Sequence, residues 1–186
     1  MLLTHNQLMT LIKKNVIENV PEENVNAASI DLTLGSIIHT ERTPPGGHGG
    51  LYGPIELADK ENIYMEEVSI EDFYYDLYPG EFILAQTQEI FHLPNTIAGE
   101  FKLKSSAARN GLDHHLAGWC DPGWHGSVLT LEFKNNTQHH VLRLRHKMKI
   151  GQIVLWQGEE VPSEASYASR GQYNGDLAAT QSKGIK

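Results

Sequence analysis

The feature of this chain that most constrains its fold is a series of short β-prone segments separated by turn sequences. The segments contain many β-branched and aromatic residues, and several alternate apolar and polar residues with the period of a half-buried strand. Runs containing Gly, Pro, Asn or Asp separate them and are typical of tight turns. Many short strands joined by turns favour a sandwich, jelly roll or small barrel. The predicted strands are residues 29–34, 81–86, 99–103, 128–133, 141–144 and 152–156.

One helix is expected at the N-terminus, over residues of about 5–15. Leu8, Leu11 and Ile12 recur there at helical spacing, after the possible N-caps Thr4 and Asn6. A length of 186 residues fits one domain. We therefore expect a single domain over residues 1–186, with a flexible Gly/Pro insertion near 44–50 and a mobile C-terminal tail from about 167 that orders over a ligand.

Charge and cysteine content restrict the class of partner. The formal net charge of −8 argues against a nucleic-acid binder, because such proteins neutralise phosphates with clustered cations. No apolar run approaches the ~20 residues of a membrane-spanning helix, and the N-terminus resembles no signal peptide. A cytoplasmic location, with neither a nucleic-acid nor a membrane partner, is expected. Cys120 is the only cysteine, so a multi-cysteine zinc site cannot form within one chain.

Two groups of residues are candidates for chemistry. Lys104, Ser105 and Ser106 could bind phosphate at a short turn that ends near Gly111, but an ordinary surface turn explains them equally well. Glu132 stands between Leu131 and Phe133, so strand alternation places it on the opposite face, beside Thr130. If that face is solvent, Glu132 is an ordinary surface carboxylate. If it lines a pocket, burial raises its pKa toward that of a general base.

Two further features have plain structural explanations. Asp121 precedes Pro122-Gly123, which is a common way to open a turn. The histidines, among them His114 and His115, lack the spacing of zinc ligands, and we expect them at the surface.

Several motifs, taken in chain order, carry a resemblance to a known family. They are Ala28-Ser29-Ile30-Asp31-Leu32-Thr33-Leu34-Gly35, Leu77-Tyr78-Pro79-Gly80-Glu81, Lys104-Ser105-Ser106 with Arg109 and Gly111, Asp121-Pro122-Gly123-Trp124 with Gly126, Leu131-Glu132 with Asn135, and Met148 with Ile150-Gly151-Gln152. Together they resemble the dCTP deaminase family, which shares its trimeric β-fold with dUTPases. The resemblance runs over almost the whole chain and implies a mainly β, dUTPase-like distorted jelly roll or β-barrel that forms a homotrimer, with sites between subunits.

The resemblance also implies roles for individual residues. Glu132 would be the catalytic acid/base, assisted by Ser105 and Arg109. The residues implied to contact the nucleotide are Lys104, Ser106 and Gln152 near the phosphates, Ala117, Gly118 and Trp119 at the pyrimidine edge, Asp121 at the sugar or a water, and Tyr167, Gln172 and Tyr173 in the covering tail.

The implied reaction is hydrolytic deamination of dCTP to dUTP and ammonia. One carboxylate, Glu132, can take a proton from water and return protons to the ring and to the leaving ammonia. Zinc deaminases instead combine an H-x-E motif with P-C-x-x-C. His39-Thr40-Glu41 spells the first motif, but a single cysteine excludes the second. We therefore expect no zinc, no metal bound by protein side chains, and Mg²⁺ that arrives with the triphosphate.

The chain departs from the family pattern in two places. The spacing from Asp121 to Glu132 is one residue longer than usual, which a β-bulge near Ser127 would absorb. In the tail, Gln172 stands where the family usually has Lys, and Asp176 where it has Gln. The phosphate count of the substrate, or a modified cytosine, therefore stays open.

Other functions remain open at this point. The first is a bifunctional enzyme that also hydrolyses dUTP to dUMP and pyrophosphate, or a dUTPase alone. The second is a nucleotide-binding regulatory β-domain without activity. A trimeric structural protein ranks last, because it leaves the polar run from Lys104 to Arg109 without a purpose.

Overall fold

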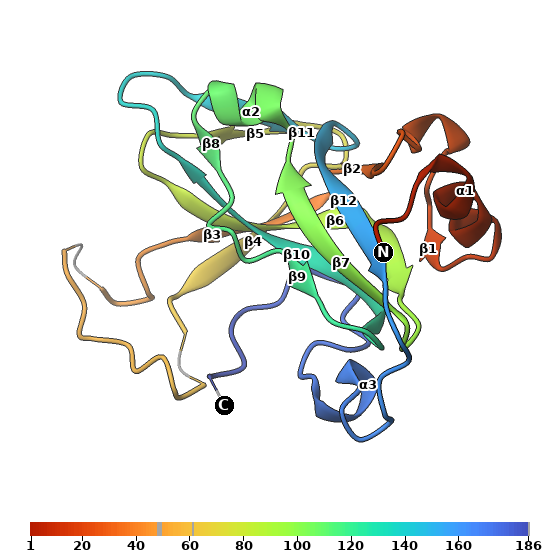
Figure 1. Ribbon diagram of the computed structural model, residues 1–186. Coiled ribbons are helices and arrows are strands. Elements are labelled where there is room, and N and C mark those ends of the chain that lie inside the picture. The colour runs from red at the N-terminus through yellow and green to blue at the C-terminus, as the bar shows by residue number, and fades with distance from the viewer. Residues whose placement is uncertain (48–49, 61, 186) are drawn as a thin grey trace.

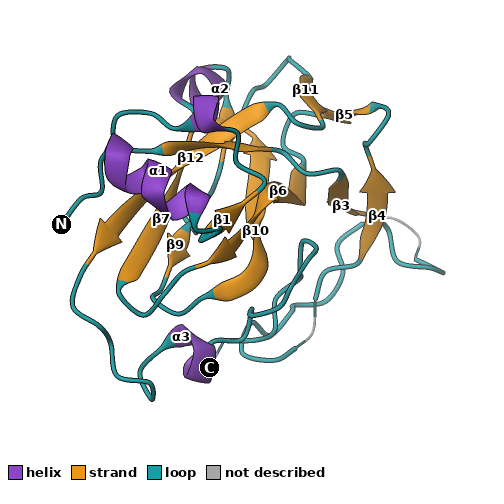
Figure 2. Ribbon diagram, turned by 90° about the vertical axis from the view of Figure 1, so that its right-hand side faces the viewer, coloured by secondary structure: helices purple, strands orange, loops and turns teal. Residues whose placement is uncertain are grey.

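The structure is a computed structural model that describes residues 1–47, 50–60 and 62–185. Residues 48 and 49 of the predicted Gly/Pro insertion lie outside the described residues. The described chain is mainly β-strand with a few short helices (Figures 1 and 2), as the sequence predicts. The helices are α1 (His5–Lys13), the 3₁₀ helix η1 (Glu22–Asn24), α2 (Ser105–Arg109) and α3 (Tyr167–Arg170). None of the helices in these ranges is long and apolar enough to cross a membrane.

The strands are more numerous, and several are longer, than the sequence predicts. They are β1 (Ile17–Glu18), β2 (Ile30–Thr33), β3 (Ile37–Glu41), β4 (Met65–Ser69), β5 (Tyr74–Leu77), β6 (Phe82–His92), β7 (Ile97–Leu103), β8 (Leu112–Asp113), β9 (Trp119–Cys120), β10 (His125–Asn135), β11 (Leu142–Arg145) and β12 (Lys149–Gln157).

Two antiparallel sheets form the body of the fold. One has the order β4-β3-β6-β10-β8, with β1 also paired to β6, and the other has the order β2-β12-β7-β9. Strands β5 and β11 form a separate ladder. The long pair β6–β10 is the part of the first sheet that carries Glu132.

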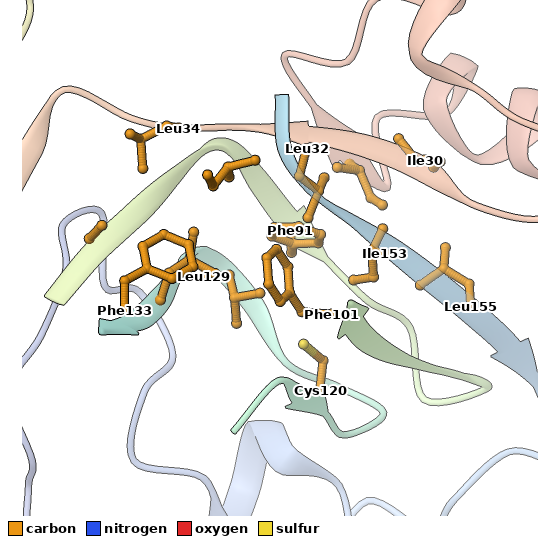
Figure 3. Packing of buried hydrophobic residues seen from close by; sticks show 14 of the residues in the cluster. Ile30, Leu32, Leu34, Phe91, Phe101, Cys120, Leu129, Phe133, Ile153 and Leu155 are labelled. Carbon is orange, nitrogen blue, oxygen red and sulfur yellow. The ribbon is translucent and has the colours of Figure 1, made fainter. Parts of the chain in front are cut away.

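The core lies between the two sheets, as Figure 3 shows. Phe91 of β6 and Phe133 of β10 are fully buried on one side, and Ile153 and Leu155 of β12 on the other. Burying a side chain of this size contributes about 1.5–3 kcal/mol relative to leaving it exposed. This core holds β10 in place, because Leu131 and Phe133 are buried in it while Glu132 between them points to the opposite face.

The N-terminal helix forms where the sequence predicts it, but it is shorter. Thr4 is the N-cap, and its backbone N–H donates to the side chain of Gln7 (3.1 Å). Leu8 and Ile12 are buried against the core. The helix ends at Lys13, and Asn15 adopts a left-handed conformation (φ 55°) that the helix cannot continue through.

Strand β10 contains the predicted irregularity near Ser127. Its pairing with β6 shifts register between His125 and Ser127, and again between Val128 and Thr130. At the first shift β10 has one residue more than β6, and at the second β6 has two residues more than β10. A one-residue shift reverses the facing of the side chains that follow it, whereas a two-residue shift keeps it. After these shifts, Thr130 and Glu132 face the same cavity.

Candidate active site

A cavity of about 630 Å³ lies beside β6 and β10. Glu132 and Thr130 of β10 line it together with Phe82 and Leu84 of β6. Its other walls come from residues 55–57 and 62–65, from the segment that leads into and out of β9, and from the C-terminal tail. The cavity that Glu132 faces is therefore formed by four separate parts of the chain.

The carboxyl group of Glu132 is partly buried. Its side chain is 28% exposed, and burial raises the pKa of the carboxyl from its ordinary 4.5 to about 7. Its Oε2 atom is buried without a hydrogen-bond partner among the described residues. An unpaired buried oxygen costs about 1–3 kcal/mol, so this atom is placed to receive a proton donor from a ligand or a water.

His114 lies next to this carboxyl group, with 3.5 Å between its Nε2 and Oε2 of Glu132. Nε2 is also buried without a partner in the described part of the chain. Burial, and to a lesser degree the charge of His115, lowers the pKa of His114 to about 4. His114 is therefore neutral at neutral pH, and the two side chains do not form an ion pair.

The expectation of a surface histidine is wrong for His114. Its side chain is only 5% exposed and packs on Phe101, with 4.4 Å between the ring centroids, and on Phe133 at 5.7 Å. The local sequence Asp113-His114-His115 gives no sign of this burial. Strand β8 ends at Asp113, so alternation along a strand does not extend to His114.

Ala117, Trp119, Cys120 and Asp121 form another wall of the cavity. The two residues before them, His115 and Leu116, adopt left-handed conformations (φ 36° and 58°). Ala117 and Trp119 line the cavity, whereas Gly118 is buried and its carbonyl accepts a hydrogen bond from the backbone N–H of Phe101 (2.8 Å). Residues 117 and 119 thus face the cavity, while the backbone of residue 118 is hydrogen-bonded to β7.

Asp121 lies at the mouth of the cavity and is exposed. Its Oδ1 accepts a hydrogen bond from the indole N–H of Trp119 (2.8 Å). Asp121 also lines a second cavity of about 520 Å³, which it shares with Tyr167, Gln172 and Tyr173. The two cavities are therefore adjacent and meet at Asp121, Tyr167 and Tyr173.

The C-terminal tail lies across the first cavity. The backbone of Asp176 accepts a hydrogen bond from Val128 N–H (2.9 Å), and Thr180 N–H donates to Oγ1 of Thr130 (3.1 Å). Tyr167 and Tyr173 line both cavities, whereas Gln172 lines only the second. The three tail residues implied by the resemblance therefore border the same pair of cavities.

The connection between β3 and β4 contributes residues that the sequence analysis missed. Ile55, Leu57 and Ile63 form an apolar wall of the cavity. This segment also binds the tail, because Asn62 donates to the carbonyl of Ser182 (3.0 Å). Alternation and motif spacing give no signal for these residues, since they lie in an irregular segment.

The remaining predicted site residues lie elsewhere in the chain. Ser105, Ser106 and Arg109 are exposed on α2, at the top of Figure 1, and the tail with α3 is at the bottom. Lys104 binds Asp31, with 2.6 Å between Nζ and Oδ1, and Gln152 lies near Ser29 (3.4 Å). None of these five residues lines the cavity of Glu132 in the described chain. One chain thus holds two separate groups of the predicted site residues.

Among the described residues, the charged side chains that line the first cavity are all acidic. Its lining residues within the described ranges include three carboxylates and no Lys or Arg. They are Asp121, Glu132 and Asp176. A cavity of this kind favours an anionic ligand only if cations reach it from another source.

Comparisons with known proteins give a consistent result. The family model for dCTP deaminase-like proteins matches residues 2–158. A "dCTP deaminase, dUMP-forming" of Nanoarchaeum equitans is 36% identical, covering 98% of this chain and 97% of its own. Another from Methanosphaerula palustris is 33% identical, covering 98% and 95%. Among solved structures, the 2'-deoxycytidine 5'-triphosphate deaminase from Agrobacterium tumefaciens matches the fold with a TM-score of 0.66, at 18% identity, covering 89% of this chain and 51% of that one.

Proposed function

The chain belongs to the dCTP deaminase-like family, and we propose that it is an enzyme that converts dCTP to dUMP, with release of ammonia and pyrophosphate. The sequence alone ranks deamination to dUTP first and the dUMP-forming reaction second. Because the relatives are named as dUMP-forming, we rank the second reaction first. The observation that carries the proposal is Glu132, a buried carboxyl group with a pKa of about 7 in a cavity of nucleotide size.

Deamination is the first proposed step, and Glu132 moves its protons. The ionised carboxylate takes a proton from water, the oxygen of the water bonds to C4 of the cytosine, and Glu132 passes that proton to ring N3. Glu132 then takes the proton of the new C4 hydroxyl and gives it to the amino nitrogen, so that the C4–N4 bond breaks, ammonia leaves, and C4 becomes a carbonyl. A pKa near the working pH suits a group that must both accept and donate protons, and such catalysis contributes about 10²–10⁴-fold.

His114 suits this step because it is neutral. A protonated imidazole beside Glu132 would favour the carboxylate and lower its pKa. With its own pKa near 4, His114 leaves the carboxyl free to titrate near neutral pH.

Hydrolysis at the α-phosphate is the second proposed step. Water attacks the α-phosphorus, the bond to the bridging oxygen of the β-phosphate breaks, and pyrophosphate leaves. Asp121 is a candidate to activate this water, because it is an exposed carboxylate at the junction of the two cavities. The triphosphate would enter as its Mg²⁺ complex, whose charge also reduces repulsion from Asp121 and Asp176.

The cations for this substrate are proposed to come from a second copy of the chain. The cavity of Glu132 offers a triphosphate three carboxylates and no cation from its own described residues. Lys104, Ser105, Ser106 and Arg109 form a separate group on and beside α2. A cyclic homotrimer that brings α2 of one subunit to the cavity of the next would complete each site.

The proposal includes no zinc. Cys120 is the single cysteine of the sequence, so the paired cysteines of a zinc deaminase site cannot come from one chain. We also propose a cytoplasmic enzyme, because its substrate belongs to the nucleotide pool.

The test is incubation of the purified protein with dCTP and Mg²⁺, with chromatography of dCTP, dUTP and dUMP and an ammonia assay. We expect dUMP, ammonia and pyrophosphate in equal amounts, and no product from Glu132→Gln. Activity that resists a zinc-selective chelator would support the zinc-free mechanism. Accumulation of dUTP alone would restrict the function to deamination, and nucleotide binding without turnover would favour a regulatory domain.

The shared site is tested by mixing two inactive variants. Glu132→Gln and Arg109→Met chains are unfolded together in equal amounts and refolded. If each site combines Glu132 of one subunit with Arg109 of the next, about a quarter of the sites should be intact. If the mixture refolds as well as the wild type but recovers no activity, Glu132 and Arg109 do not act together across a subunit boundary.

A further inference from the structure

The tail contains a closed ring between Gln172 and Lys183. The ammonium group of Lys183 binds both carboxylate oxygens of Asp176 (3.0 and 2.7 Å) and the carbonyl of Gln172 (2.9 Å). It also lies over the ring of Tyr173, 4.9 Å from its centroid. The backbone N–H of Lys183 donates to the hydroxyl of Tyr173 (3.1 Å). One side chain thus joins three residues that lie seven to eleven positions away along the chain. We call this set of contacts the tail clasp.

The clasp acts on two residues of the cavity wall. Tyr173 and Asp176 line the cavity of Glu132, and Tyr173 also lines the second cavity. The Tyr173 carbonyl is bound to the body by the indole N–H of Trp124 (3.0 Å) and the hydroxyl of Ser127 (2.8 Å). Trp124 and Ser127 therefore hold the backbone of Tyr173. The tail clasp holds the ring of Tyr173 next to Lys183.

The ion pair of the tail clasp is partly shielded from water. The side chains of Asp176 and Lys183 are 23% and 33% exposed, so water screens their attraction only in part.

We propose that Lys183 is a positioning residue for nucleotide binding, which acts through Asp176 and Tyr173 by holding the tail closed over the cavity. This inference rests on the proposed function for its ligand but not for the clasp itself. The competing role is a direct one, in which Lys183 leaves Asp176 and binds a phosphate.

The two roles give different results for Asp176. If Lys183 acts through the clasp, Asp176→Ala and Lys183→Met open the same ring and should have the same effect, and the double variant should be no worse than either. If Lys183 binds phosphate directly, Asp176→Ala frees the ammonium group and should tighten binding, whereas Lys183→Met should weaken it. Lys183→Arg keeps the charge and should retain most of the wild-type behaviour under the clasp.

The first experiment is hydrogen–deuterium exchange without nucleotide, on the wild type, the two single variants and the double variant. The control is Lys13→Met, which removes an exposed ion pair with Glu22 (3.7 Å) far along the chain from the tail. We expect exchange in residues 173–183 to rise about fivefold in Lys183→Met and Asp176→Ala, the factor that about 1 kcal/mol produces. Exchange in β6 and β10 should not change. Unchanged exchange in the tail would overturn the clasp whether or not the protein uses dCTP.

The second experiment is steady-state kinetics with dCTP and Mg²⁺. We expect the same variants to raise KM about fivefold with kcat nearly unchanged, because the clasp contributes to binding and not to the chemical steps. The increase should be equal in the double variant and absent in Lys13→Met. A lower KM in Asp176→Ala, or a fall in kcat with constant KM in Lys183→Met, would overturn the positioning role.

Discussion

Replacing Glu132 with Gln should stabilise the protein at alkaline pH while it removes activity. The folded protein buries the carboxyl group without a hydrogen-bond partner for Oε2 among the described residues. Burial disfavours the charged form, which raises the pKa from its ordinary 4.5 to about 7. Gln has nearly the same shape and no charge, so the substitution removes this cost and leaves the packing in place.

The sign and size of the effect follow from proton linkage. Between pH 4.5 and 7 the folded state binds more protons at Glu132 than the unfolded state does, so stability falls as pH rises. The contribution is fully present below pH 4.5 and is lost once pH has risen through about 7. Each tenfold change in proton affinity is worth about 1.4 kcal/mol, so ionised Glu132 costs about 3 kcal/mol above pH 8.

The assay is urea denaturation of the wild type and of Glu132→Gln from pH 5 to 8.5, at one fixed protein concentration because of the proposed trimer. The variant should gain about 3 kcal/mol over the wild type at pH 8.5 relative to their difference at pH 5. An exposed strand carboxylate, Glu67 of β4, serves as the control through Glu67→Gln. A difference that does not change with pH would refute the account of Glu132 as a buried, unpaired carboxyl group.

Arg109→Met should enlarge the pH effect if Arg109 of a second copy approaches Glu132 in the assembly, because its charge favours the ionised form.

Three further substitutions test the fold that positions this site. Asn135→Ala should cost about 2–4 kcal/mol in urea denaturation, because buried Asn135 donates to the carbonyls of Leu77 (2.9 Å) and His140 (2.8 Å) and both lose their donor. Gly151→Val should prevent the two strands around it from packing, since a Cβ there would come within 2.0 Å of the Phe101 ring; a well-folded variant by circular dichroism would contradict this. In Glu89→Gln the free energy of unfolding should fall less between pH 4.5 and 7 than in the wild type, because burial raises the pKa of the Glu89 carboxyl to about 7. A pH profile of stability equal to that of the wild type would contradict this.

The sequence predicts the strands that have a clear alternation, and it misses those that do not. Strands at 30–33, 97–103 and 149–157 contain or overlap predicted segments, because each contributes several buried apolar residues to the core. Strand β4 has no buried residue along its five positions, so its sequence lacks the signal on which the prediction depends. Strands β8 and β9 have two residues each, too short for a period to show. The family resemblance, and with it the β-rich fold class, is confirmed.

For the site, the structure brings some of the predicted residues together and leaves others apart. Glu132, Asp121 and Tyr167, which the family resemblance implies, border one pair of adjacent cavities. The same resemblance treats Arg109 as their neighbour, although it lies on α2 and away from the cavity in one chain. His114, Ile55 and Ile63 carry no signal at all, because their places at the cavity depend on contacts between distant segments.

The facing of Glu132 shows how a local irregularity decides a functional question. Simple alternation back from Phe133 puts Thr130 and Glu132 on one face, but it cannot say whether that face meets solvent or a pocket. The extra residue between Asp121 and Glu132 would turn that face away from the site in a regular strand. The register shift at 125–127, where β10 has one residue more than β6, absorbs it, while Leu131 and Phe133 keep their places in the core. The core therefore fixes which face Glu132 occupies, and the irregular start of β10 lets the turn at Asp121 reach the same cavity.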